Sequence, residues 1–162
     1  METTTNTGSA AATGDGGQTV TQLNSLLRGE ISAAETYRMA IDKVADSNDT
    51  ANAGLLREIQ EEHGRAAQGI RDRIRELGGE ASDSSGAWGA WAKTVQGTMN
   101  LFGDGAALKS LKEGEEHGLK DYQEAIDDVD PSSAQLIQNQ LIPAQQRHIN
   151  LLDQLINSAA RA

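Results

Sequence analysis

The chain contains no cysteine among its 162 residues. This absence excludes disulfides, thiolate nucleophiles, iron–sulfur clusters and zinc sites built on thiolates. Any metal in this protein must therefore be held by histidine and carboxylate side chains.

Proline and aromatic residues are also scarce, with 2 prolines and 3% aromatic residues. Ala, Leu, Ile, Glu, Gln and Arg fill long stretches instead, which favours helices over a sheet. Hydrophobic residues make up 37% of the chain, enough for one compact core. We expect a single all-α domain over residues 19–162, preceded by a disordered tail at residues 1–18 that is poor in apolar side chains.

Basic residues are outnumbered, with 14 Lys and Arg against 24 Asp and Glu and a net charge of −10. This charge repels phosphate backbones and anionic lipids, so we expect neither a nucleic acid nor a membrane as a partner. No apolar run approaches the roughly 20 residues of a membrane span, and the N-terminus lacks the basic start and apolar centre of a signal peptide. We expect a cytoplasmic protein.

One pattern occurs twice in the chain: a Glu-x6-Tyr element is followed by a Gln-x-x-His element. The matched residues are Glu30 and Glu115, Tyr37 and Tyr122, Gln60 and Gln145, and His63 and His148. The offset is 115 − 30 = 85 in every pair. A shared offset for two separate elements indicates a duplicated helical hairpin.

Apolar residues at three- and four-residue spacings predict four long helices. The predicted ranges are about 21–45, 51–77, 106–129 and 131–159. Thr19-x-x-Gln22 resembles a capping box before the first helix, and Asp130-Pro131 combines a cap with a first-turn proline at the start of the fourth. Gly78-Gly79 supplies the left-handed stop of the second helix.

The connections between these helices predict how they are arranged. A short link makes two helices antiparallel neighbours, whereas residues 78–107 are too many for a simple turn and should cross the length of the bundle. Within this crossover, a short amphipathic helix is expected to cover the bundle or to form a dimer contact; its apolar residues are Trp88, Trp91, Val95 and Met99. Pro143 should kink or locally open the fourth helix one turn before His148.

Each predicted helix carries one ionisable residue where a seven-residue apolar series is interrupted. These residues are Glu30, His63, Glu115 and His148. They lie at similar depths from the hairpin turns, so an antiparallel bundle would bring them into one layer. Two glutamates inside a bundle need cations, hydrogen-bond donors or a metal, because burying a lone carboxylate is costly. Carboxylate and imidazole are suitable ligands for Fe, Mn or Zn, and we therefore predict that these four residues are metal ligands.

Several neighbouring polar residues could support this layer. Tyr37 and Tyr122 follow the two glutamates by seven residues and could orient them with hydrogen bonds. Gln60 and Gln145, one turn before the histidines, could add a weak amide ligand or a hydrogen bond. The flanking residues Glu35, Glu62, Glu116 and His117 lie on acidic, solvated helix faces, with Glu62 and Glu116 as reserve ligands. An alternative stays open, in which Glu–His hydrogen-bonded pairs form a structural polar layer that binds no metal.

With these elements repeated around a long crossover, the chain resembles the ferritin-like superfamily. Its members carry Glu in the first and third helices and Glu-x-x-His in the second and fourth. Here Gln60 and Gln145 stand where that superfamily has bridging glutamates, and an amide cannot supply the negative charge that holds two oxidised irons. The resemblance implies a ferritin-like four-helix bundle of two tandem hairpins, with one metal ion or with a divalent pair aided by Glu62 or Glu116.

At closer range the chain resembles a bacterial ferritin-like four-helix-bundle family of unknown function, over about Gln22 to Ile156. The residues that carry this resemblance are Leu23-Asn24-x-Leu26, Glu35-x-Tyr37, Leu77-Gly78-Gly79-Glu80, Ser85-Gly86, Trp91, Gly114-Glu115-x6-Tyr122 and His148. That family's pattern matches Glu35, Glu115 and His148 better than Glu30 and His63.

Two functions follow as hypotheses. In the first, the bundle binds one or two divalent ions of Fe, Mn or Zn in its core, without an organic cofactor, for metal sequestration or oxidation chemistry. In the second, a non-catalytic structural or stress-associated protein self-associates as a homo-oligomer, a dimer or larger, and binds no metal. Whether the protein is an enzyme stays open, although no Ser-His-acid order or nucleophile elbow indicates nucleophilic catalysis.

Overall fold

A computed structural model of the chain describes residues 11–46, 50–102 and 104–161. Within these ranges the regular structure is helical, without a strand, which confirms the predicted all-α class. The helices are α1 (Ala11–Asp46), α2 (Thr50–Glu76), α3 (Gly89–Phe102), α4 (Asp104–Ala125), α5 (Pro131–Leu136) and α6 (Ile142–Ala159). Short 3-10 turns cover Gly86–Trp88 and Ile126–Asp128, and a π-helical turn covers Ile137–Leu141.

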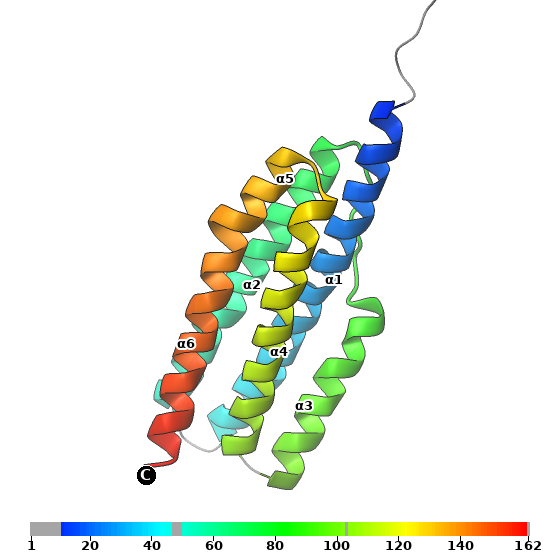
Figure 1. Cartoon of the computed structure of the whole chain (residues 1–162). Helices are drawn as coiled ribbons and strands as arrows, with labels where there is room; N and C mark the ends of the chain where they lie inside the picture. Colours follow the sequence, from blue (N-terminus) through cyan, green and yellow to red (C-terminus); the bar gives the residue numbers. More distant parts are fainter. Residues whose placement is uncertain (1–10, 47–49, 103, 162) are drawn as a thin grey trace, which may run out of the picture.

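Helices α1, α2 and α4 and the rod that runs from α5 to α6 lie side by side in one four-rod bundle (Figure 1). Helices α1 and α2 form one antiparallel pair, and α4 pairs with the rod made of α5 and α6. Helix α3 lies outside these rods and packs against α1 and α4, as predicted for the crossover. Ala92 and Val95 are buried apolar residues among the α3 side chains that the structure describes, and the predicted contacts of Trp91 and Met99 lie outside that description.

The apolar core is divided into two clusters of buried side chains. One cluster includes Leu27, Ile70 and Ile137, and the other includes Ile41, Leu56 and Leu152. In all four rods the boundary between the clusters falls at a buried polar residue, so a polar layer lies midway along the bundle.

Helix α2 ends at the glycine pair that the sequence predicts. Gly78 has φ of 74°, a left-handed conformation that glycine adopts without a Cβ clash. Its N–H donates to the carbonyl of Arg75 over 2.9 Å, and Gly79 donates to the carbonyl of Ile74 over 2.9 Å. These bonds satisfy carbonyl groups in the last turn of the helix.

Helix α1 begins at Ala11, earlier than the predicted start near Thr21. Thr19 is therefore inside the helix, where its buried hydroxyl accepts a 3.0 Å hydrogen bond from the backbone N–H of Asp130, instead of capping the helix start. Of the predicted tail, residues 1–10 lie outside the described residues and Ala11–Gln18 belong to α1. The short link predicted between the first two helices, at residues 46–50, includes residues 47–49, which also lie outside the described residues.

The fourth rod begins, and is locally opened, where its sequence predicts. The Asp130 carboxylate accepts hydrogen bonds from the backbone N–H groups of Ser132 and Ser133, and Pro131 occupies the first turn of α5. The π-helical turn then opens the rod immediately before Pro143, which lacks a backbone N–H to close a regular α-turn.

Candidate metal centre

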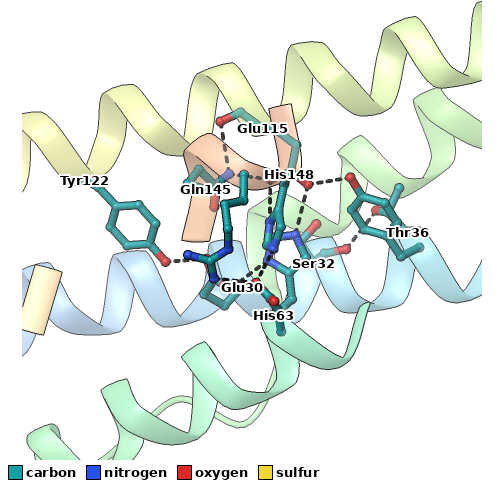
Figure 2. Close-up of polar contacts among 11 residues, drawn as sticks. Glu30, Ser32, Thr36, His63, Glu115, Tyr122, Gln145 and His148 are labelled. Carbon is teal, nitrogen blue, oxygen red and sulfur yellow. Dashed lines mark hydrogen bonds and ion pairs between the residues drawn. The ribbon is translucent and has the colours of Figure 1, made fainter. Parts of the chain in front are cut away.

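The polar layer is built from one residue on each rod (Figure 2). Helix α1 supplies Glu30, α2 supplies His63, α4 supplies Glu115 and α6 supplies His148. Their exposed fractions are 5%, 1%, 2% and 2% respectively, so all four are withdrawn from solvent. The structure thus brings together the four residues that the seven-residue series singles out.

Both histidines lie against Glu115. The Nε2 atom of His63 is 2.9 Å from Glu115 Oε1, and the Nδ1 atom of His148 is 3.3 Å from Glu115 Oε2. The outer nitrogen of each ring has a further carboxylate partner: His63 Nδ1 is 2.8 Å from Glu30 Oε2, and His148 Nε2 is 2.9 Å from Glu62 Oε2. Glu115 is therefore the central residue of the layer.

The two tyrosines bond across the repeat. Tyr37 on α1 donates a 2.5 Å hydrogen bond to Glu115 on α4, and Tyr122 on α4 donates to Glu30 on α1. Each tyrosine thus holds the glutamate of the other hairpin, which fits the orienting role predicted for both.

The two glutamines behave differently although they are repeat partners. Gln145 is buried and donates to Glu115 twice, to the backbone oxygen over 3.0 Å and to Oε2 over 2.6 Å. Gln60 turns away and donates to the carbonyl of Ala34 over 3.4 Å. Gly118 makes room for Gln145, because a Cβ at Gly118 would lie 2.8 Å from the glutamine Nε2 atom. The repeat equivalent of Gly118 is Ala33, which carries a methyl group where Gly118 leaves space.

Glu62 was expected on a solvated face with a reserve role as a ligand, and the structure brings it into the layer through His148. It is partly buried, and it pairs with Arg147 over 3.1 Å as well as with His148. Burial would raise the pKa of Glu62, but His148 and Arg147 outweigh burial and lower it below its usual value. This carboxylate therefore stays ionised and links His148 to the protein surface.

The other predicted flanking residues lie outside the layer. Glu35 is exposed and accepts a 3.0 Å hydrogen bond from the Ser85 hydroxyl. Glu116 is exposed and pairs with Lys112 over 3.4 Å, so the structure does not bring this reserve ligand to the centre. His117 is exposed beside Asp121, at 3.6 Å.

Burial and charge act against each other at the centre. Burial would raise the pKa of Glu115, but the two histidines outweigh it and lower the pKa to about 2. Burial would lower the pKa of His63, but Glu115 and Glu30 raise it well above its usual value. In the metal-free protein, His63 is thus an imidazolium held between carboxylates. Burial and the adjacent glutamates raise the pKa of Tyr37 and of Tyr122, which remain neutral donors.

Three of the four residues are close enough to share a metal ion. One ligand atom from each of His63, Glu115 and His148 lies within 4.8 Å of the other two. Two imidazoles and a carboxylate are a donor set suited to Fe, Mn or Zn. The same groups also satisfy one another, since no buried side-chain nitrogen or oxygen in the described ranges lacks a hydrogen-bond partner.

Sequence reasoning missed the polar residues that border the layer on α1. The hydroxyl of buried Ser32 donates to the carbonyl of Trp88 over 2.7 Å, and buried Thr36 donates to the carbonyl of Ser32 over 2.7 Å. The Ser32 bond fastens the segment before α3 onto α1, whereas the Thr36 bond lies within α1. The signal was a series of small residues on α1 at three- and four-residue spacings, which include Ser25, Gly29, Ser32, Ala33 and Thr36.

Comparison with known proteins gives a family but no described activity. The family described as "Domain of unknown function (DUF2383)" matches residues 18–128, more than half of the chain. This range contains Glu30, His63 and Glu115, whereas His148 lies beyond it. A search of curated proteins finds no match. Of the helices in the described ranges, none is both long enough and apolar enough to cross a membrane. The chain belongs to the DUF2383 family, a family whose function is unknown.

Proposed function

We propose that His63, Glu115 and His148 bind one divalent metal ion in the centre of a ferritin-like bundle. The observation that carries the proposal is that their ligand atoms lie within 4.8 Å of one another in a buried layer. The ligand atoms would be Nε2 of His63, the carboxylate of Glu115 and Nδ1 of His148, because these atoms face one another.

The surrounding groups would orient these ligands. Glu30 bonds the outer nitrogen of His63, and Glu62 bonds the outer nitrogen of His148, an arrangement that fixes the tautomer and direction of a metal-binding imidazole. In this proposal Glu30 supports a ligand instead of binding the metal itself. Tyr37 and Gln145 hold the Glu115 carboxylate in place.

Charge also favours a cation at this centre. Glu30 and Glu115 bring two buried carboxylates next to His63, whose pKa they raise well above its usual value. A divalent ion would replace the proton on His63 Nε2 and would neutralise more of the negative charge than a proton does. Metal binding should therefore release a proton and strengthen as the pH rises.

The donor set favours one ion over two. Gln60 turns to the carbonyl of Ala34, and Gln145 is an amide that already donates to Glu115, so the layer lacks the bridging carboxylates of a di-iron centre. Two imidazoles and one carboxylate leave coordination positions free for another ligand, which suits Fe(II) oxidation chemistry as well as metal sequestration.

A second candidate function is a structural polar layer in a protein that self-associates and binds no metal. The observation that favours it is the complete hydrogen bonding of the buried polar side chains in the described ranges. Under this hypothesis the imidazolium of His63 and the carboxylates of Glu30 and Glu115 stabilise one another permanently.

Metal content and thermal stability separate the two candidates. We would purify the protein without chelator, measure Fe, Mn and Zn by elemental analysis, and then add each metal to the metal-free protein. At 100 times the dissociation constant, a metal that binds only the folded state stabilises it by about 2.7 kcal/mol, which corresponds to roughly 5–10 °C in melting temperature. His148→Ala should abolish both the bound metal and the thermal shift.

His117→Ala is the matched control, because His117 is an exposed histidine and is not one of the three proposed ligands. The metal hypothesis expects this variant to bind metal like the parent protein. If the parent carries no stoichiometric metal and none of the three metals raises its melting temperature, the structural layer is the better account.

A further inference from the structure

A pocket of about 80 Å³ lies between α1 and α4, directly beside the polar layer. Trp88, His117 and Asp121 line it together with the buried residues Glu30 and Glu115. Trp88 and His117 lie against each other, with ring centroids 5.3 Å apart, and His117 is exposed. The pocket thus extends from the protein surface to the proposed metal ligands.

The wall of this pocket is mostly carbon although many of its residues are polar. The polar atoms are already engaged: Ser32 bonds Trp88, Thr36 bonds Ser32, and Tyr37 bonds Glu115. Gly29 and Ala33 leave space without adding a polar group. A molecule in the pocket would therefore find apolar surface and few free hydrogen-bonding groups.

The size and charge of the pocket limit what it can hold. A cavity needs about 10–15 Å³ to hold one water molecule, so this pocket fits a molecule of only a few non-hydrogen atoms. Anions are disfavoured, because Glu30, Glu115 and Asp121 all line it. The groove on the opposite side, between α2 and α6, instead presents the charged pair of Glu62 and Arg147.

We propose that this pocket admits a small, uncharged, weakly polar molecule to the free coordination positions of the metal. The inference rests on the proposed metal function, because the molecule would meet the metal at the inner end of the pocket, where Glu115 and His63 line it. The α1–α4 side is then the substrate side of the centre, and the α2–α6 side is the side on which His148 meets Glu62.

Gly29→Leu is designed to fill the pocket without disturbing the ligands. Gly29 lines the pocket, and a Cβ added there would meet no atom within 4 Å. Gly64→Leu is the matched control, because a Cβ at exposed Gly64 on α2 also meets no atom within 4 Å. Both changes replace a helical glycine with the same good helix former, so their effects on helix propensity should be alike.

Xenon tests the pocket in the metal-free protein. We would record methyl NMR spectra under xenon pressure and follow Leu26, Ala33 and Leu111, which line the pocket. The inference expects shifts at these methyl groups in the parent and in Gly64→Leu, and a loss of most of the shift in Gly29→Leu. Absence of shifts in the parent, or equal shifts in Gly29→Leu, would overturn it.

Nitric oxide and azide then test the route to the metal. With Fe(II) bound, nitric oxide should give the electron paramagnetic resonance signal of an iron–nitrosyl in the parent and in Gly64→Leu. In Gly29→Leu this signal should fall at least tenfold while the iron content is unchanged. In the parent, an excess of anionic azide should leave the iron–nitrosyl signal unaltered. A full nitrosyl signal in Gly29→Leu, or binding of azide, would contradict the inference.

The two proposals fail in different ways. A parent protein that binds none of Fe, Mn and Zn overturns the metal function and the inner end of this route, whereas the xenon experiment still decides whether the pocket accepts an apolar guest. A parent that binds iron but shows no xenon shift and no nitrosyl keeps the metal function and loses the pocket.

Discussion

Tyr37 on α1 donates a 2.5 Å hydrogen bond to Glu115 on α4. Its repeat partner Tyr122, on α4, donates in the opposite direction to Glu30 on α1. These crossed bonds join the two hairpins at the level of the polar layer. The two copies of the Glu-x6-Tyr element therefore meet in one centre, in which the tyrosine of each copy bonds the glutamate of the other.

The crossed bonds predict different effects of two similar substitutions. Tyr37→Phe and Tyr122→Phe should each destabilise the metal-free protein by about 1.5–3 kcal/mol, since each removes a donor from a buried carboxylate. Only Tyr37 contacts a proposed ligand, so Tyr37→Phe should also weaken metal binding by roughly 10–100-fold, and Tyr122→Phe should weaken it less. Urea denaturation and competition with a chelator of known affinity measure the two effects. Equal losses of metal affinity in the two variants would mean that Glu30 and Glu115 contribute alike to metal binding.

The stability of the metal-free protein should depend on pH through Glu115. Its pKa falls from an ordinary 4.5 to about 2 on folding, so its stabilising effect is present above pH 4.5 and is lost as the pH falls toward 2. The loss should be about 3 kcal/mol, and urea denaturation at a series of pH values measures it. Glu115→Gln should remove most of this dependence. Glu116→Gln, at the exposed neighbouring position, should keep it.

His63 should make the stability of the metal-free protein fall at high pH, in contrast to Glu115, whose effect is lost at low pH. Its pKa is raised on folding, so its stabilising effect is fully present below its ordinary value of 6.5 and is lost as the pH rises through the raised pKa. Metal binding should reverse this trend, because the metal competes with the proton. The metal-free protein should lose stability from neutral toward alkaline pH, while the metal affinity increases over the same range. Parallel changes in the two quantities would contradict the placement of the metal on His63.

Gly118→Ala tests the contact that distinguishes the two repeats. The new Cβ would lie 2.8 Å from Gln145 Nε2, so the amide must shift from its present position, and we expect its hydrogen bond to Glu115 to be lost. A helical Gly→Ala change alone adds about 0.5–1 kcal/mol of stability, which Gly64→Ala in open space should show. Gly118→Ala should instead be about 1–3 kcal/mol less stable than Gly64→Ala, because it costs the Glu115 hydrogen bond. Equal stabilities in thermal unfolding would show that Gln145 contributes little.

Asp130→Ala tests stability away from the polar layer. The Asp130 carboxylate caps α5 and pairs with Arg73 over 2.8 Å, so its loss should cost about 1–2 kcal/mol without changing the metal content. Asp127→Ala, at an exposed nearby position, should change stability by less than about 0.5 kcal/mol. A loss of metal in Asp130→Ala would show that the end of the bundle and its centre are coupled.

The sequence was sufficient to predict the rods and the residues that meet between them. Seven-residue spacing reports depth along a helix, and Glu30, His63, Glu115 and His148 do lie in one layer. The effect of Pro143 was also predictable, since a missing N–H inside a helix opens it locally.

The unequal roles of the repeat partners could not be predicted. Gln60 and Gln145 have equivalent positions in the sequence, but Gln145 reaches Glu115 through space that Gly118 leaves on the neighbouring helix, whereas Gln60 donates to the carbonyl of Ala34. Glu62 looked solvated because its helix face is acidic. Its contact with His148 depends on how closely α2 and α6 approach each other, which periodicity within one helix does not report.

Anomalous X-ray scattering from crystals of protein purified without chelator tests the central claim most directly. Data collected on both sides of the Fe, Mn and Zn absorption edges locate and identify a bound ion. The account predicts one peak per chain, within bonding distance of His63 Nε2, the Glu115 carboxylate and His148 Nδ1. A buried layer without a peak after soaking in each metal, or a peak held by other residues, would contradict it.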